Sequence, residues 1–435
     1  MSAITLMRGK QSGTKLCFLP RTVRDRRNAW GVRAAYAVVL LCLATAIASP
    51  GQTYTTLVNF NKSDGALPES SLIQGFDGKL YGTTNWGPND NGNVFKVTDS
   101  GTLTTLHNFC TQTNCGDGNH PYTAVVQAPS GMFYGTTSAR GAHNAGTVFK
   151  ITANGTLATL YSFCSQAKCA DGKRASTLVL GSDGNLYGTT AAGNYDGCGT
   201  QGCGTVFKVT RSGVLTTLFS FCGKSTCVDH GFQPMAGLVQ GTDGNFYGTT
   251  YAGGTNHNGT IFKITPTGNL TTLYSFCAQA NCADGAYPLG ALVQGADGNF
   301  YGTTLLGGLM NSNGCSNGCG TVFKISSGGE LTTLHDFCSE ANCADGAASA
   351  YGPNLIQASD GDFYGTSTAT IFKITPQGVL TPLYNTPNSA NNLVQASDGN
   401  FYGTTAHGGL YNWGTVFRLS VGLGPFVETT PTPSP

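Results

Sequence analysis

Asp77-Gly78-Lys79-Leu80-Tyr81-Gly82-Thr83-Thr84 is the first of seven copies of one eight-residue stretch, whose commonest form is D-G-N-F-Y-G-T-T. The tyrosines of the seven copies are Tyr81, Tyr134, Tyr187, Tyr247, Tyr301, Tyr364 and Tyr402. Their spacing runs from 38 residues before Tyr402 to 63 residues before Tyr364. Self-similarity at a period of this size is typical of a repeat architecture. The stretch therefore predicts a chain built from seven similar units.

Each unit carries four strand-like segments in a fixed order. In the fourth unit they are Leu238–Gly241, Asn245–Thr250, the segment centred on Phe262, and Leu270–Phe276. Runs of β-branched and aromatic residues bounded by Gly, Asp and Asn are the signature of strands and hairpins. Four antiparallel strands per repeat form a propeller blade. We predict an all-β fold, a seven-bladed β-propeller over residues 53–420.

The two ends of the repeat region decide between a closed ring and a linear solenoid. The seventh unit stops after its third strand, Gly414–Ser420, and an isolated fourth-strand pattern stands at Tyr54–Phe60. A linear array would leave this strand without a partner and a sheet edge exposed. We therefore expect the N-terminal strand to complete the last blade and close the ring.

The segments outside the repeats predict export. Residues 1–48 resemble a signal peptide, with a basic region at Arg21–Arg33, an apolar run at Ala34–Ala48 and a small-x-small cleavage site at Ala46–Ala48. The apolar run is shorter than the roughly 20 residues needed to span a bilayer, so we expect no transmembrane segment in the mature chain. Residues 421–435 form a Pro/Thr-rich C-terminal linker. The expected location is extracellular, on the cell surface or in the periplasm.

Three motifs, G-x-x-Y-G-T-T, G-T-V-F-K and L-T-T-L-x-x-F, recur in this order along the chain. In this arrangement the chain resembles the GloVer tandem-repeat proteins of bacteria, over residues 53–420. The sixth unit departs most, because Pro382 interrupts its fourth strand and no cysteine loop follows. The resemblance implies an exported repeat protein, and it carries over no catalytic residue and no cofactor.

Fourteen of the 16 cysteines lie beyond the predicted signal peptide, in closely spaced pairs. An even number at regular spacing in an exported chain predicts local disulfides. The predicted pairs are Cys110/Cys115, Cys164/Cys169, Cys198/Cys203, Cys222/Cys227, Cys277/Cys282, Cys315/Cys319 and Cys338/Cys343. Structural zinc would need four converging ligands, whereas these pairs are expected to stand apart in separate blades, so we predict no metal. Pairing between loops is the remaining alternative.

Composition and motifs limit the functions to consider. Charged residues make up 10% of the chain and the net charge is +1, so neither nucleic acid nor an anionic membrane is an expected partner. G-x-S-x-G occurs once, at Gly314–Gly318 between two predicted strands, and H-E-x-x-H does not occur. Acid–base hydrolysis of glycosides normally uses two facing carboxyl groups, and the isolated candidates Asp90 and Asp196 show no sign of meeting. A binding protein without a cofactor is therefore favoured over an enzyme.

The connections of a propeller alternate between two faces. The turns between first and second strands and between third and fourth strands form one face, here called the turn face, and they look too short to build a pocket. The longer connections between second and third strands and between blades form the loop face, where binding sites usually develop. The candidate ligand-binding residues there are Trp86, Tyr195, Tyr251, His257, Tyr411 and Trp413.

Aromatic side chains beside amides suit a neutral polar ligand such as a glycan, or a protein surface. We predict a monomeric binding or surface-interaction module with a carbohydrate or a surface protein as partner. A structural cell-surface scaffold without a small ligand, and a glycoside hydrolase or lyase on the same face, are the alternatives. Calcium also stays open at a series of aspartates after the fourth strands, although one carboxylate per loop falls short of the roughly six to eight oxygens it needs. These aspartates are Asp64, Asp117, Asp171, Asp229, Asp284 and Asp345.

Overall fold

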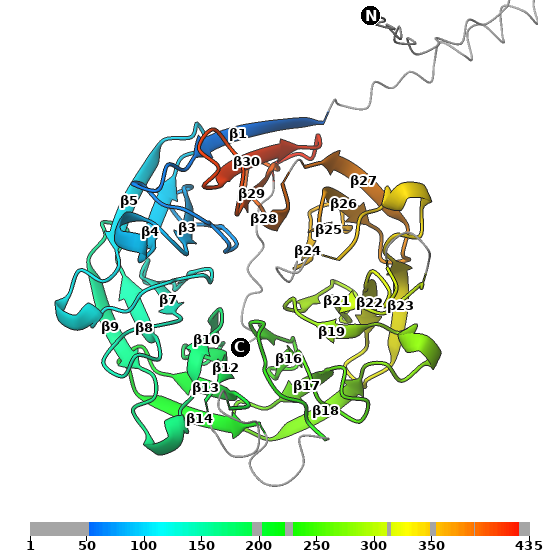
Figure 1. Ribbon diagram of the computed structural model, residues 1–435, viewed down its shortest axis with the longest axis horizontal. Coiled ribbons are helices and arrows are strands. Elements are labelled where there is room, and N and C mark those ends of the chain that lie inside the picture. The colour runs from blue at the N-terminus through cyan, green and yellow to red at the C-terminus, as the bar shows by residue number, and fades with distance from the viewer. Residues whose placement is uncertain are drawn as a thin grey trace, which may run out of the picture. The chain divides into compact units, whose positions relative to one another are not determined.

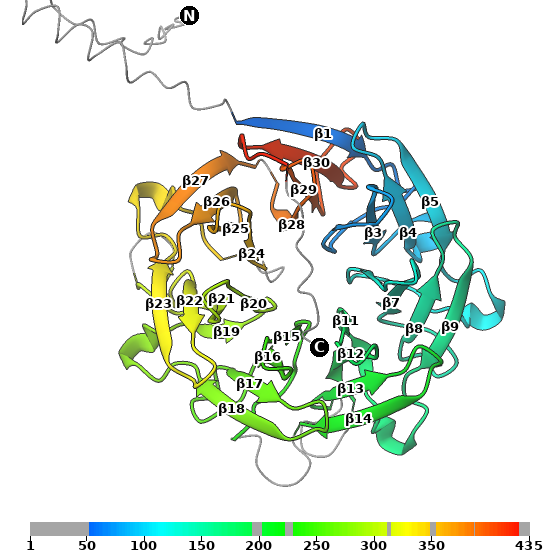
Figure 2. The same ribbon diagram turned by 180° about the vertical axis from the view of Figure 1, so that it is seen from behind.

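The computed structural model describes residues 52–193, 202–221, 229–310, 315–348, 354–386 and 388–425. Residues 52–425, apart from those gaps, form seven antiparallel sheets arranged in a ring (Figures 1 and 2). These described parts contain short 3-10 turns and no α-helix. The fold is therefore the predicted all-β, seven-bladed β-propeller.

Each blade has four strands in meander order, and the first strand lies nearest the central axis (Figure 1). Blade 1 contains β2 (Ile73–Gln74), β3 (Leu80–Thr84), β4 (Asn93–Val97) and β5 (Leu103–Asn108), and blade 2 contains β6 (Val126–Gln127), β7 (Phe133–Thr137), β8 (Thr147–Ile151) and β9 (Leu157–Ser162). Blade 3 contains β11 (Val179–Leu180), β12 (Leu186–Ala192), β13 (Thr205–Val209) and β14 (Leu215–Ser220), and the short strand β10 (Lys173–Ala175) also pairs with β12. Blade 4 contains β15 (Val239–Gln240), β16 (Phe246–Thr250), β17 (Thr260–Ile264) and β18 (Leu270–Ser275).

Blades 5 to 7 continue the same pattern around the ring (Figure 2). Blade 5 contains β20 (Val293–Gln294), β21 (Phe300–Leu306), β22 (Thr321–Ile325) and β23 (Leu331–Asp336), and the short strand β19 (Ala286–Pro288) also pairs with β21. Blade 6 contains β24 (Ile356–Gln357), β25 (Phe363–Thr366), β26 (Thr370–Ile374) and β27 (Leu380–Asn385). Blade 7 contains β28 (Ala390–Gln395), β29 (Phe401–Thr405), β30 (Thr415–Ser420) and β1 (Thr53–Asn59). The 3-10 turns are η1 (Pro88–Asp90), η2 (Thr113–Cys115), η3 (Ala167–Cys169), η5 (Ala280–Cys282) and η6 (Ala341–Cys343).

The N-terminal strand closes the ring, as predicted. β1 pairs antiparallel with β30, from Thr53 opposite Ser420 to Asn59 opposite Thr415, and the two strands lie side by side at the rim in Figure 1. Nearer the axis, the Ser397 N–H of blade 7 donates to Gln74 Oε1 of blade 1 at 2.8 Å. The first and last units are therefore joined both at the rim and beside the axis.

The tyrosine of the repeated stretch joins neighbouring blades. Tyr247 of blade 4 is buried and stacks on Phe300 of blade 5, with ring centroids 3.9 Å apart. The same stacking joins four further pairs, Tyr81–Phe133, Tyr187–Phe246, Tyr301–Phe363 and Tyr364–Phe401. The Tyr247 hydroxyl donates to Asp243 Oδ2 at 2.8 Å, so the Asp of the turn also holds the tip of the tyrosine ring. One residue position thus serves both the hairpin and the inter-blade contact.

The glycine and the first threonine of Y-G-T-T pack against neighbouring elements. A Cβ on Gly135 would lie 2.5 Å from Cζ of Phe149 on the next strand, so the side chain of any other residue would collide there. Thr83 Oγ1 donates to the Thr123 carbonyl of the next blade at 2.9 Å. Because a buried hydroxyl is costly without a partner, this threonine adds a directional bond between blades, as its equivalents Thr136, Thr189, Thr249 and Thr404 also do.

The sixth blade corrects one expectation. β27 is continuous through Pro382, which lies opposite Phe372 at a register shift in the β26–β27 ladder. Outer strands tolerate proline, because the missing N–H can face solvent and a bulge removes the need for a ladder bond. Pro382 therefore does not interrupt the fourth strand.

We predict that Phe60→Ala destabilises the whole propeller by about 3–5 kcal/mol, the usual cost of truncating a buried phenylalanine. Phe60 follows β1, is 0% exposed and packs edge-on against Phe95 of blade 1 at 5.3 Å. Phe76 is the matched control because it is 73% exposed, so Phe76→Ala should change stability by at most about 0.5 kcal/mol. Denaturant unfolding measures both, and equal effects would contradict this account of the closing contact.

Candidate functional site

The turn face has more relief than its short turns predict. A cleft of about 510 Å³ lies between blades 5 and 6, and others of about 310 Å³ and about 230 Å³ lie between blades 4 and 5 and blades 7 and 1. The expectation of no pocket on this face is therefore wrong, because space opens between adjacent blades rather than within one turn. The groups there already bind each other: Asp243 accepts from Tyr247 and Asn245 and pairs with Lys263 at 3.0 Å.

On the loop face, the two tryptophans of blades 1 and 7 lie against one segment, residues 61–67. The Trp86 carbonyl accepts from the Ala66 N–H at 2.7 Å, and the Trp413 carbonyl accepts from the Leu67 N–H at 3.0 Å. Lys62 Nζ lies 5.4 Å from the Trp413 ring centroid and 2.9 Å from Asp90 Oδ1. We call Lys62, Trp86, Asp90 and Trp413 the tryptophan patch. Ring closure thus brings residues more than 300 positions apart into one surface.

Trp86 has no counterpart at the equivalent position of other blades. Trp86 pairs with Ala66 in an isolated bridge, and the corresponding bridges of blades 2 and 4 hold Ala139 and Ala252. Trp86 is 37% exposed, and its ring centroid lies 6.2 Å from that of His120. A large exposed aromatic therefore replaces alanine at a position that the repeat does not require to be large.

Glu69 stands two residues beyond this segment, and the sequence analysis did not single it out. Its Oε2 accepts from Asn85 Nδ2 at 3.0 Å, and the Asn85 carbonyl lies 3.0 Å from His120 Nδ1. Burial raises the pKa of the Glu69 carboxyl above its usual value, and the Asn85 hydrogen bond and the charges of His407 and His120 oppose this only in part. The available signal was that glutamate is rare in this chain and that Glu69 lies four residues before the first strand of blade 1.

Glu69 lines a cavity of about 170 Å³ on the central axis, to which all seven blades contribute the residues around the start of their first strands. The cavity wall is mostly polar and includes Ser71, Thr177, Asn354 and Asn392, with Glu69 as its only carboxylate among the described residues. Residues from units about fifty positions apart converge there because the first strands of the ring lie nearest the axis.

Tyr122 also lines this cavity, beside Glu69. Its hydroxyl donates to the Ala175 carbonyl at 3.4 Å, a long bond. Burial raises the pKa of Tyr122 to about 12. The phenol therefore stays protonated at neutral pH, and it offers the cavity an aromatic edge and a hydroxyl.

The other predicted residues are divided around the ring. Tyr411 is 56% exposed and shares its connection with Trp413. Tyr251 and His257 belong to blade 4, where Tyr251 packs on Tyr287 at 5.1 Å and His257 closes a tight turn. Blade 4 lies across the ring from β1 and β30 (Figure 1). Tyr195 and Asp196 lie outside the described residues, so a single site does not gather the whole predicted set.

Five predicted disulfides close locally. They are Cys110–Cys115, Cys164–Cys169, Cys277–Cys282, Cys315–Cys319 and Cys338–Cys343. Cys203 is also disulfide-bonded, and Cys198, Cys222 and Cys227 lie outside the described residues. The expectation that the pairs stand apart fails in blade 5, where the sulfurs of Cys315, Cys319 and Cys338 all lie within 4.8 Å of one another.

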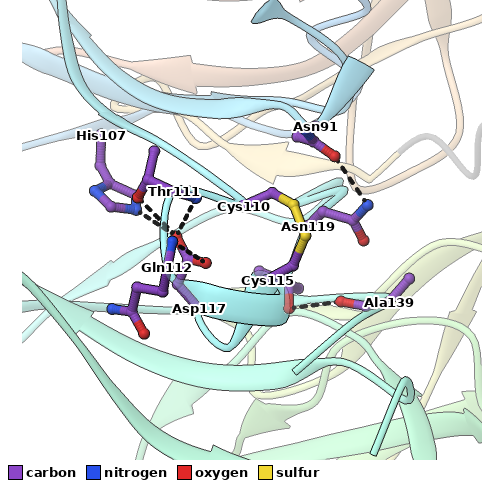
Figure 3. The surroundings of a disulfide bond; sticks show 10 residues. Asn91, His107, Cys110, Thr111, Gln112, Cys115, Asp117, Asn119 and Ala139 are labelled. Atoms are coloured by element: carbon purple, nitrogen blue, oxygen red, sulfur yellow. Dashed lines mark hydrogen bonds and ion pairs between the residues drawn. A yellow bond between two sulfur atoms is a disulfide. The ribbon is translucent and has the colours of Figure 1, made fainter. Parts of the chain in front are cut away.

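Among the described residues, a buried aspartate organises four of the cysteine loops that follow a fourth strand, as Figure 3 shows for the first one. Asp117 is 0% exposed, and its carboxylate lies 3.0 Å from His107 Nε2 and accepts from the N–H groups of Thr111 and Gln112. The equivalent residues of three other loops, Asp171, Asp284 and Asp345, make the same kind of contacts. These carboxylates satisfy loop amides, which accounts for them structurally without calcium.

Asp345 shows the electrostatic consequence of this arrangement. Burial by itself would raise the pKa of its carboxyl, but the hydrogen bonds from Ser339 and His335 outweigh burial and hold the pKa below its usual value. The carboxylate is therefore ionised at neutral pH and available as an acceptor. The oriented donors of Ser339 and His335 offset the cost of burying this charge.

The sequence profile of the Gloeobacter/Verrucomicrobia repeat matches residues 44–201, 111–314 and 199–392, most of the chain. The chain belongs to this family. A search of curated proteins found no match to this Gloeobacter/Verrucomicrobia repeat protein. In the described residues, no helix is long and apolar enough to cross a membrane. The five disulfides are consistent with an exported protein.

Several solved structures are similar to the Gloeobacter/Verrucomicrobia repeat fold at low sequence identity. A streptogramin B lyase has a TM-score of 0.56 and 15% identity, over 86% of this chain and 99% of the lyase. A virginiamycin B lyase from Staphylococcus aureus has a TM-score of 0.55 and 13% identity, over 85% of this chain and 98% of the lyase. The extracellular domain of a hybrid two-component system from B. thetaiotaomicron has a TM-score of 0.51 and 12% identity, over 84% of this chain and 39% of that chain. At these identities the likeness concerns the fold only.

We predict that Glu69→Gln raises the melting temperature at neutral pH and leaves it unchanged in acid. The raised pKa of Glu69 means that its stability contribution is present below the usual value of 4.5 and is lost as pH rises through the raised value. Glutamine keeps the acceptor for Asn85 and removes the charge. Melting curves at pH about 3.5 and about 7.5 measure the difference, and a variant less stable than the parent at pH 7.5 would overturn this assignment.

Proposed function

We propose that the protein is an exported binding module that holds a carbohydrate on the loop face, over blades 7, 1 and 2. The observation that carries this proposal is that Trp86 and Trp413 are held by adjacent residues, Ala66 and Leu67, of one segment that leads to Glu69 and the axial cavity. Loops on a rigid scaffold are usual binding positions. The partly exposed indoles are the groups on this surface best able to supply binding energy.

Carbohydrates present apolar C–H faces and a rim of hydroxyls, and the surface offers partners for both. The tryptophan patch supplies amphipathic aromatic rings. Asn85, Glu69 and His120 supply hydrogen-bonding groups beside them, linked in sequence by the 3.0 Å contacts described above. The Lys62–Asp90 ion pair neutralises the remaining charges at the patch. A neutral, polyhydroxyl ligand therefore fits this surface better than a polyanion.

The enzyme alternative has less support in this geometry. Two facing carboxyl groups are the usual requirement for glycoside cleavage. Glu69 is the single carboxylate among the described cavity residues, and Asp90 is engaged by Lys62. The lyase neighbours share the fold of this chain, and at 15% and 13% identity they carry no residue role across to it.

Intrinsic fluorescence tests the proposal directly, because Trp86 and Trp413 are the only tryptophans beyond Trp30 in the predicted signal peptide. Titrating the mature protein with a panel of neutral oligosaccharides should shift the tryptophan emission for the sugar that binds. Trp86→Ala and Trp413→Ala should each weaken that binding by about 1–3 kcal/mol. Affinity should vary little with salt, since a neutral sugar forms no ion pair with the protein.

Tyr251→Ala is the matched control, because it removes an aromatic from the same face in blade 4. It should leave affinity unchanged. A sugar affinity that is unchanged in both tryptophan variants would contradict the proposed surface. If none of the oligosaccharides binds, the structural scaffold or a protein partner is favoured. If shorter sugars are released, the hydrolase or lyase is favoured.

A further inference from the structure

Blade 5 holds two disulfides in contact with each other. Cys315–Cys319 lies in the connection between β21 and β22, and Cys338–Cys343 follows β23. The sulfurs of Cys315, Cys319 and Cys338 lie within 4.8 Å of one another. Both connections belong to the loop face. We propose that these four cysteines form a thiol–disulfide exchange site that can transfer a bond from one connection to the other.

Exposure determines where exchange begins. An external small-molecule thiol of the glutathione class, as its thiolate, attacks the more accessible sulfur of a disulfide. Cys338 is 1% exposed, and Cys343 is partly exposed. Attack therefore occurs at Cys343 Sγ, which becomes a mixed disulfide with the reagent, and Cys338 leaves as a thiolate.

The second step passes the bond within the protein. The Cys338 thiolate attacks Cys319 Sγ, the Cys319–Cys338 bond forms, and Cys315 leaves as a thiolate that takes a proton from water. Cys319 is 8% exposed, whereas Cys315 is partly exposed. A thiolate is less costly where water reaches it, and a better leaving group reacts faster, so Cys315 is the sulfur released. The reagent's thiol is consumed, one protein thiol appears, and no net oxidation occurs.

The exchange changes which connections of the loop face are cross-linked by disulfides. The new bond would tie the β21–β22 connection to the start of the segment after β23, and the Cys338–Cys343 loop would open. A cleft of about 270 Å³ between blades 4 and 5 is lined by Tyr287, Met310 and Asn317, and the last two belong to the β21–β22 connection. The exchange site therefore controls the rim of a loop-face cleft, independently of the tryptophan patch.

Blade 1 provides an internal control in the same molecule. Its Cys110–Cys115 loop has the same spacing and the same buried pairing, His107 with Asp117, that His335 makes with Asp345 in blade 5. No cysteine occurs in residues 85–92 or 138–146, the neighbouring connections of the loop face. A thiolate at Cys110 therefore has no adjacent disulfide to attack.

The experiment treats the oxidised full-length mature protein with limiting glutathione, quenches with acid, blocks free thiols with an alkylating reagent and maps peptides without reduction. Blade 5 should yield a Cys319–Cys338 peptide, alkylated Cys315 and glutathione on Cys343. Blade 1 should yield only glutathione on one cysteine and an alkyl group on the other. Replacing Cys315 and Cys319 by serine together should convert blade 5 to the blade 1 pattern, with alkylated Cys338.

Two results would overturn the exchange site. One is glutathione on Cys343 with Cys338 alkylated in the parent protein, as in blade 1. The other is a Cys338–Cys343 bond that stays closed while Cys110–Cys115 opens. If the double serine variant does not fold, the comparison between blades 5 and 1 within the parent protein still decides the question.

Discussion

The packing of each blade's tyrosine against the next blade, a ring stack at five of the seven junctions, is the contact on which the rest of the propeller depends. Tyr247 shows its three components: a buried ring, a face-to-face neighbour in the next unit, and a hydroxyl held by Asp243. The contact works only in a ring, because an open array would leave one tyrosine and one partner exposed. β1 completes the ring by pairing with β30, so the termini of the repeat region stabilise each other as ordinary neighbours do.

A closed ring of similar blades also creates the conditions for a unique site. Every blade offers the same backbone positions on the loop face, so a change of side chain at one position alters the surface without altering the fold. Trp86 occupies a position held by alanine in blades 2 and 4, and Glu69 occupies one held by Tyr122 in blade 2 and Met235 in blade 4. The proposed carbohydrate surface arises from such replacements in adjacent blades.

The repeated motifs predicted the blade count, the strand order, the closing strand and the local disulfides, because each of these is written in short stretches with a fixed period. Glu69 and the axial cavity were missed, since the cavity forms where single residues of distant units converge. The turn-face clefts were missed because they depend on the angle between blades. The contact between Cys319 and Cys338 was missed because spacing along the chain does not measure distance across one blade.

Ring closure by β1 is the central claim, because the placement of Trp86 and Trp413 on the one segment 61–67 depends on it. Deleting residues 52–60 and measuring amide hydrogen exchange together with thermal melting tests it most directly. The account predicts loss of protection in β30, Thr415–Ser420, whose outer partner is removed, and a lower melting temperature for the whole propeller. Unchanged protection in β30 and an unchanged melting temperature would contradict it.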